Sequence, residues 1–122
     1  EKYLRSRFAH QRNEVVYALC LDAKCKPLGC VFLGEGSVNS ANVPVRRVVE
    51  ACLNANATSV ILAHNHPGGV SIPSPEDVQT TRRIAAALQT VEIHLADHIV
   101  VADGDYVSMV QSGCRFDTYL LP

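Results

Sequence analysis

Several features that would place the chain in a familiar class are missing from its sequence. No run of apolar residues approaches the roughly 20 that a membrane-spanning helix needs, and no signal-peptide pattern is visible. The five cysteines are odd in number and form no CxxC pair, which argues against a disulfide framework and against a thiolate zinc site. We therefore expect free thiols and a cytoplasmic location.

Charge of either sign is scarce as well. Charged residues make up 19% of the chain, and the formal net charge is -1. Nucleic-acid-binding domains are more often basic, so the composition does not support a large phosphate-binding surface. The sequence also has no GxSxG motif and no cysteine beside a recognisable histidine partner, which argues against a serine or cysteine nucleophile. Nothing in it indicates an oligomeric state.

What is present suits a single folded domain. The chain has 122 residues, of which 48% are hydrophobic, enough to form a core. We expect the domain to span residues 14–112. Residues 1–13 are expected to be the end of a preceding helix or a linker, and residues 113–122 a C-terminal tail.

Hydrophobic patterns predict seven elements in the order ββαβαββ, which is an α/β fold with a mixed β-sheet and packed helices. Runs of β-forming residues indicate strands, and apolar residues at helical spacing indicate helices. The expected strands are 14–21, 28–34, 59–63, 92–102 and 106–110, and the expected helices begin after Pro44 and Ser74. The strand 59–63 is continuously apolar, as in a strand that is buried on both faces.

A polar segment rich in glycine and proline, HNHPGGVSIP, follows this central strand. His64 and His66 are two residues apart, so in an extended segment their rings point to the same side and can chelate one metal ion. Asp77, one turn into the next helix, could complete the two-histidine, one-carboxylate pattern of catalytic zinc sites. Two other interpretations fit the spacing. The histidines could be ordinary polar surface, and Asp77 could be a capping-box partner of Ser74.

Two stretches of the sequence resemble a known family. HNHPGGVSIPSPED looks like the JAMM, or MPN-plus, metalloprotease motif, and more specifically like the RadC form, HNHPSGDPTPSxxD. ADHIVVADGDYVS is similar to the family's LDHIIIGDGxYxS, and with the flanking strands the resemblance covers nearly all of residues 14–110. Gly68 and Val70-Ser71 depart from the family pattern at positions that match no ligand. The resemblance implies a cytidine-deaminase-like JAB/MPN domain.

Carried over position by position, the resemblance implies one zinc ion per chain on His64, His66 and Asp77. Ser74 matches a serine thought to stabilise the oxyanion, and Glu14 matches a glutamate that serves as general base, although it could also be an ordinary strand-start carboxylate. The implied activity is that of a zinc-dependent hydrolase, which cleaves a peptide or isopeptide bond through a zinc-activated water. Its substrate is expected to be a peptide or protein bound as an extended strand.

Two polar residues interrupt the strand expected over residues 92–102. Asp97 has the parity of the apolar Ile93 and Leu95, so it should point inward, where a carboxylate needs a partner. It could orient a ligand histidine through a hydrogen bond, or it could cap the neighbouring loop. His98 has the opposite parity and is not expected to be a ligand.

Two rival functions stay open at the level of sequence. The RadC name refers to DNA repair, so the chain could bind or process nucleic acid. The letters HNH at residues 64–66 do not support a nuclease, because HNH nucleases spread those residues over a ββα unit. The chain could also be a non-catalytic MPN scaffold that binds partner proteins, although such scaffolds usually lack the metal ligands.

Overall fold

The computed structural model describes residues 13–36, 43–67, 72–102 and 105–114. Within them the chain forms an α/β fold in the predicted order ββαβαββ. The strands are β1 (Val15–Leu21), β2 (Pro27–Glu35), β3 (Ser59–His66), β4 (His94–Ala102) and β5 (Asp105–Ser108), and the helices are α2 (Val45–Asn54) and α3 (Pro75–Gln89). The tails expected over residues 1–13 and 113–122 lie almost entirely outside the described residues.

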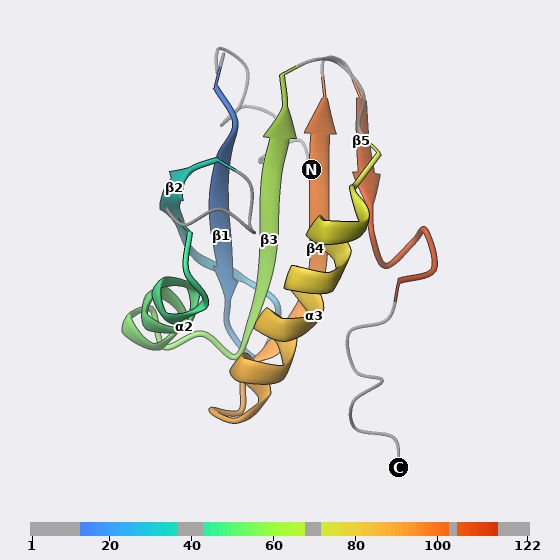
Figure 1. The fold of residues 1–122 in the computed structure, drawn as a ribbon. Helices are drawn as coiled ribbons and strands as arrows, with labels where there is room; N and C mark the ends of the chain where they lie inside the picture. Colours follow the sequence, from blue (N-terminus) through green and yellow to red (C-terminus); the bar gives the residue numbers. More distant parts are fainter. Residues whose placement is uncertain (1–12, 37–42, 68–71, 103–104, 115–122) are drawn as a thin grey trace.

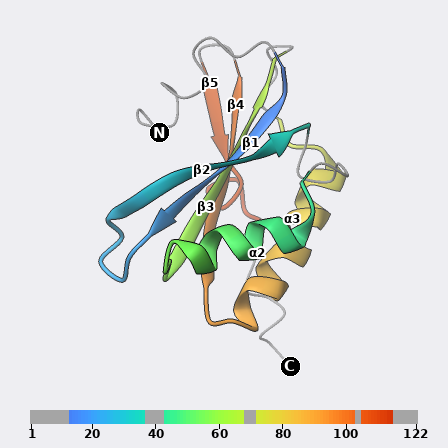
Figure 2. The ribbon, with the colours of Figure 1, turned by 90° about the vertical axis from the view of Figure 1, so that its left-hand side faces the viewer.

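The five strands form one mixed sheet in the order β2-β1-β3-β4-β5. β3 pairs antiparallel with β1 and parallel with β4, while β2 and β5 pair antiparallel at the two edges. Both helices cover the same face of this sheet (Figures 1 and 2). In the part of the chain that the structure describes, no helix is long and apolar enough to cross a membrane.

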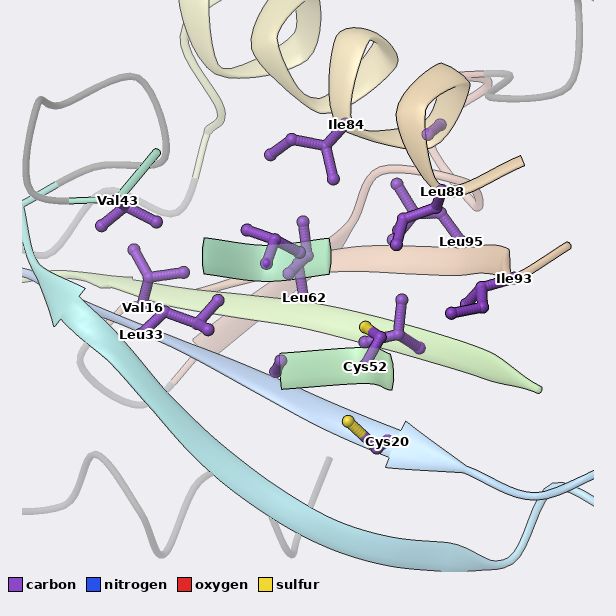
Figure 3. Close-up of a cluster of buried hydrophobic side chains, with 14 of the residues drawn as sticks. Val16, Cys20, Leu33, Val43, Cys52, Leu62, Ile84, Leu88, Ile93 and Leu95 are labelled. Carbon is purple, nitrogen blue, oxygen red and sulfur yellow. The ribbon is translucent and has the colours of Figure 1, made fainter. Parts of the chain in front are cut away.

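The main core lies between the helices and the sheet (Figure 3). Leu62 of β3 is fully buried there against side chains from both helices, among them Val48, Ile84 and Leu88. A smaller apolar cluster on the opposite face of the sheet includes Ala63 of β3. The prediction that this strand is buried on both faces is therefore confirmed.

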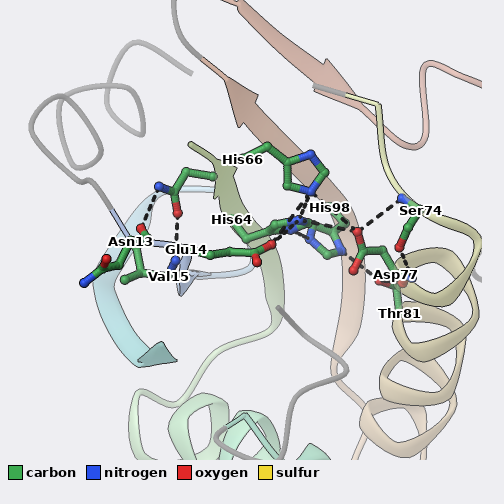
Figure 4. A network of polar contacts seen from close by, with 10 residues as sticks. Asn13, Glu14, Val15, His64, His66, Ser74, Asp77, Thr81 and His98 are labelled. Carbon is green, nitrogen blue, oxygen red and sulfur yellow. Dashed lines mark hydrogen bonds and ion pairs between the residues drawn. The ribbon is translucent and has the colours of Figure 1, made fainter. Parts of the chain in front are cut away.

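β3 is longer than the sequence predicted. The apolar run ends at Ala63, but the strand continues through His66. His64 is paired with Val16 of β1, and His66 is paired with Ala102 of β4. Strands on both sides hold the backbone extended, so the change to polar side chains does not end the strand. Both histidines consequently project from a rigid strand, on the side that faces α3 (Figure 4).

A bulge in β4 overturns the predicted orientations of Asp97 and His98. Val60 pairs with Leu95, but Ile61 pairs with Asp97, so Ala96 has no partner of its own on β3. One extra residue reverses the alternation beyond it. His98 therefore faces the helices and is fully buried, whereas Asp97 is half-buried on the other side. The sequence-based assumption of unbroken alternation was wrong.

Candidate metal centre

Two imidazole rings meet at the end of β3 where the strand leaves the sheet (Figure 4). Nε2 of His64 lies 2.9 Å from Nε2 of His66. His64 is fully buried and His66 is mostly buried, so the pair forms the floor of the site rather than polar surface. The i, i+2 spacing on an extended segment accounts for this convergence.

Asp77 reaches the same space from the first turn of α3. Ser74 is the N-cap of that helix, with Pro75 at its first position, as the sequence predicted. Ser74 Oγ accepts from the Asp77 backbone N–H at 3.0 Å, and Asp77 Oδ2 accepts from the Ser74 N–H at 3.2 Å. The same Oδ2 lies 3.5 Å from Nε2 of His64 and 3.7 Å from Nε2 of His66. The capping box thus aims the carboxylate at the two histidines instead of diverting it from them.

The environment of Asp77 favours its ionised form. Burial by itself raises the pKa of this carboxyl, but the hydrogen bond and charge of His64 and the hydrogen bonds of Ser74 oppose burial, and the net pKa lies below its usual value. A buried carboxylate that stays ionised beside two imidazoles is a suitable ligand for a cation.

Glu14 approaches from the opposite side, immediately before β1. Its Oε2 lies 3.7 Å from Nε2 of His64 and 3.8 Å from Nε2 of His66. Residue 14 and His64 are 50 positions apart, and the antiparallel pairing of β1 with β3 brings them together. The carboxylate is about one-third exposed, unlike that of Asp77.

These four side chains fit the dimensions of a small metal site. Ligand atoms of Glu14, His64 and His66 all lie within 4.8 Å of one another. The three atoms contributed by His64, His66 and Asp77 are 2.9, 3.5 and 3.7 Å apart. Neighbouring ligands of a tetrahedral zinc ion with bonds of about 2.0–2.1 Å stand roughly 3.3–3.4 Å apart, so both sets have suitable spacing. The nitrogen and carboxylate donors also suit zinc.

Asn65 is a residue of the site that sequence reasoning missed. It lies between the two histidines, is 5% exposed, and clamps the backbone on both sides of Glu14. Its Oδ1 accepts from the Val15 N–H at 2.7 Å, and its Nδ2 donates to the Asn13 carbonyl at 2.9 Å. The signal in the sequence was an amide side chain at the alternate position of a strand, which implied a partner on the other face.

His98 was also missed, because the bulge in β4 is not visible in the sequence. Its Nε2 lies 2.7 Å from Nδ1 of His64, and its Nδ1 lies 2.7 Å from Oγ1 of Thr81. Complete burial lowers the pKa of His98 well below its usual value, and the nearby His64 lowers it further, so the ring is neutral.

Asp97 does not take the position beside a ligand histidine that was one of its two predicted roles. Its carboxylate accepts from the backbone N–H groups of His98 and Val110 and from the Ser108 hydroxyl. These bonds tie β4 to β5 and to the turn that follows. The alternative prediction, a structural cap, describes this residue.

Comparison with known proteins agrees with this architecture. The sequence model of the RadC-like JAB domain matches residues 1–114. Proteins named "UPF0758 protein" from Ectopseudomonas mendocina, Cellvibrio japonicus and Pseudomonas syringae pv. tomato are 44%, 42% and 40% identical to the chain over 111 residues. Each match covers 91% of this chain and 50% of the relative, so the chain spans about half the length of the curated relatives it matches. The fold, the motif at the end of β3 and these similarities together show that the chain belongs to the RadC-like JAB domain family.

Proposed function

We propose that this chain is a zinc-dependent hydrolase of the JAMM type, which cleaves a peptide or isopeptide bond. The observation that carries the proposal is the convergence of two imidazoles and two carboxylates at the end of β3, all within 3.8 Å of the Nε2 atoms of His64 and His66. Apolar side chains would stabilise the fold better at these positions, because buried polar groups are costly unless they are paired. The set is therefore better explained by function than by stability.

His64, His66 and Asp77 are the proposed ligands of one zinc ion. Asp77 is preferred to Glu14 as the third ligand because its side chain is 4% exposed and is fixed by the capping box, whereas the Glu14 side chain is 32% exposed. A zinc ion bound there would act as a Lewis acid, which acidifies water and polarises a carbonyl group.

Glu14 is the proposed general base. Its carboxylate stands close to both histidines without being needed to complete their ligand set, and a general base must reach the attacking water without being consumed as a ligand. In amide hydrolysis the water oxygen bonds to the carbonyl carbon and the carbon–nitrogen bond breaks. Glu14 would accept one proton from the water and later donate it to the leaving nitrogen, which departs as an amine.

Ser74 is proposed to stabilise the carbonyl oxygen as it becomes negative. Its Oγ accepts from the Asp77 N–H, so this capping bond does not use the hydroxyl proton. That proton can be donated to an oxyanion, and the capping bond keeps the donor in a fixed position.

The proposed substrate is a segment of peptide or protein bound in an extended conformation. β2 and β5 are the outer strands of the described sheet, and the outer edge of such a strand offers main-chain hydrogen bonds to a peptide. β2 reaches the site, because Val15, next to Glu14, is paired with Glu35. Hydrogen exchange measured with and without a cleavage-resistant peptide tests this. The peptide should slow the exchange of backbone amides along β2 or β5. Exchange rates that the peptide leaves unchanged in both strands would contradict the proposal.

Metal analysis and hydrolysis together test the proposed activity. Purified chain loaded with zinc should contain one zinc per chain, and His66→Ala should lose it. Glu14→Gln should keep the zinc but lose most cleavage of a quenched-fluorescent peptide library and of Nε-acyl-lysine model compounds, because a general base contributes about 10²–10⁴ in rate. Equal zinc in wild type and His66→Ala would refute the site. Equal hydrolysis by wild type and Glu14→Gln would refute the base.

The rival functions make different predictions. A non-catalytic scaffold needs no metal, so its partner binding would be indifferent to His66→Ala. A nucleic-acid-binding protein would retain DNA with an affinity that falls steeply as salt rises. We prefer hydrolysis because neither rival requires a buried histidine and a partly buried one to face two carboxylates.

A further inference from the structure

A continuous line of hydrogen bonds runs behind the proposed ligand His64, away from the metal side (Figure 4). Nδ1 of His64 faces Nε2 of His98, and Nδ1 of His98 faces Oγ1 of Thr81, both at 2.7 Å. Thr81 Oγ1 donates in turn to the backbone carbonyl of Asp77 at 2.5 Å. His64, His98 and Thr81 are fully buried, so water does not compete for these bonds.

The carbonyl at one end fixes the direction of every bond in this line. A carbonyl oxygen only accepts, so the single hydroxyl proton of Thr81 points to Asp77. Thr81 Oγ1 must then accept a proton from Nδ1 of His98. His98 is fully buried, and its two ring nitrogens face an imidazole and a hydroxyl rather than a carboxylate, so a charge on this ring would have no partner and the ring is neutral. A neutral imidazole carries one N–H, so Nε2 of His98 is an acceptor and receives the hydrogen bond from Nδ1–H of His64.

We propose that Thr81 and His98 are positioning residues which hold His64 in its Nδ1–H tautomer and so keep the lone pair of its Nε2 directed at the metal site. The inference rests on the proposed zinc site and adds to it the groups that prepare one ligand. With the opposite tautomer, a proton would occupy Nε2 of His64 and would have to leave before a metal could bind.

The line also connects the two kinds of ligand. It begins at the backbone of Asp77, whose carboxylate faces the site, and it ends at a ligand histidine on β3. Thr81 is one helical turn beyond Asp77, and the bond of its hydroxyl to the i−4 carbonyl fixes its rotamer. A shift of α3 would therefore disturb the carboxylate and the histidine together.

The tautomers can be measured directly in metal-free protein. Long-range ¹H–¹⁵N correlation spectra of the 122-residue chain distinguish an imidazole protonated on Nδ1 from one protonated on Nε2. Both His64 and His98 should be protonated on Nδ1. This measurement needs neither zinc nor a substrate, so it stands even if the proposed hydrolase activity fails. A wild-type spectrum in which Nδ1 of His64 lacks a proton, or in which Nε2 of His98 carries one, would overturn the proposal.

Thr81→Val tests whether the hydroxyl matters for metal binding. The substitution keeps the shape of the side chain but leaves Nδ1 of His98 without its acceptor, so both tautomers should become populated at His64. Zinc affinity, measured by competition with a chromophoric chelator, should fall about 10–100-fold, the usual effect of removing a group that orients a ligand. Thr81→Ser, which keeps the hydroxyl, should restore both the spectrum and the affinity.

Thr80→Val is the matched control. Thr80 is the neighbouring residue on α3 and is also buried, but its hydroxyl is outside the line. This variant should bind zinc as wild type does. If Thr81→Val also retains wild-type tautomers and affinity, the proposal is wrong. If wild type itself binds no zinc, the proposed function fails while the tautomers still decide this inference.

Discussion

Individual residues of this site are held in place by different groups on their different sides. His64 is surrounded by the ring of His98 behind it and by two carboxylates in front. Glu14 has a more open side chain, yet its backbone is fixed: its carbonyl accepts from the Gly36 N–H at 2.7 Å, and Asn65 holds the residues before and after it. A partly exposed side chain on a fixed backbone suits a group that must accept a proton and release it again.

Asn65→Ala should destabilise the protein without removing the metal ligands. The change leaves the buried N–H of Val15 without a partner, which costs about 1–3 kcal/mol. We expect urea unfolding to show a loss of that size and elemental analysis to show the same zinc content as wild type. Asn54→Ala is the control, because Asn54 is exposed at the end of α2 and its loss should change stability by less than about 0.5 kcal/mol. Equal stability of Asn65→Ala and wild type would mean that the clamp contributes nothing.

Among the elements, α3 contributes both to the site and to the core. Its first turn supplies Ser74 and Asp77, its second turn supplies Thr81, and its inner face packs Ile84 and Leu88 into the core. The helix start is therefore both a structural and a functional feature, and the two roles can be separated by substitution at the N-cap.

Ser74→Ala should cost about 1 kcal/mol of stability, because the N–H of Asp77 loses its acceptor at the N-cap. Urea unfolding of metal-free protein measures this cost apart from any effect on zinc. Ser74→Thr keeps an N-cap oxygen and should recover most of the loss. An alanine variant as stable as wild type would show that the capping box does not stabilise α3.

β1 and α2 meet through two buried thiols. Cys20 and Cys52 are both fully buried, and the hydrogen bond with Cys20 together with burial raises the pKa of the Cys52 thiol. Both thiols should resist alkylation in native protein because the reagent cannot reach them, and the raised pKa protects Cys52 further, since the thiolate is the reactive form. Cys25 is exposed in the turn between β1 and β2 and should react first. Mass spectrometry after brief treatment with iodoacetamide checks the order. Modification of Cys52 before Cys25 would contradict it.

At the scale of the whole molecule, the site joins segments that are far apart in the sequence. Glu14 just before β1, two histidines of β3 and Asp77 of α3 lie within a few ångströms of one another, and β4 supplies the His98 ring behind them. In unfolded chain these groups are separated, so a metal that binds them all binds only the folded state.

Zinc should therefore raise the thermal stability of the folded chain. Free zinc at 100 times its dissociation constant adds about 2.7 kcal/mol, which corresponds to an upward shift in Tm of roughly 10 °C for a domain of this size. Calorimetry with zinc and after addition of EDTA measures the shift. Glu14→Gln should show it in full, and His66→Ala should show little of it. A Tm that is unaffected by zinc in wild type would argue against a metal that bridges these elements.

The sequence by itself determined the parts of this protein that depend on local order. Apolar periodicity specified the seven elements, Ser74 and Pro75 specified the start of α3, and the i, i+2 spacing of His64 and His66 placed their rings on one side. Each of these follows from the geometry of a few consecutive residues. The resemblance to a known motif added Glu14, which no local pattern singles out.

Tertiary structure alone decided which side chains meet. The pairing of β1 with β3 brings Glu14 to the histidines, and the bulge at Ala96 turns His98 toward His64 and Asp97 away from it. A bulge is set by how two strands fit together, so alternation within one strand cannot reveal it. The hydrogen bonds from Thr81 to His98 and from His98 to His64 form only when α3, β4 and β3 are packed together, because each of them joins two different elements.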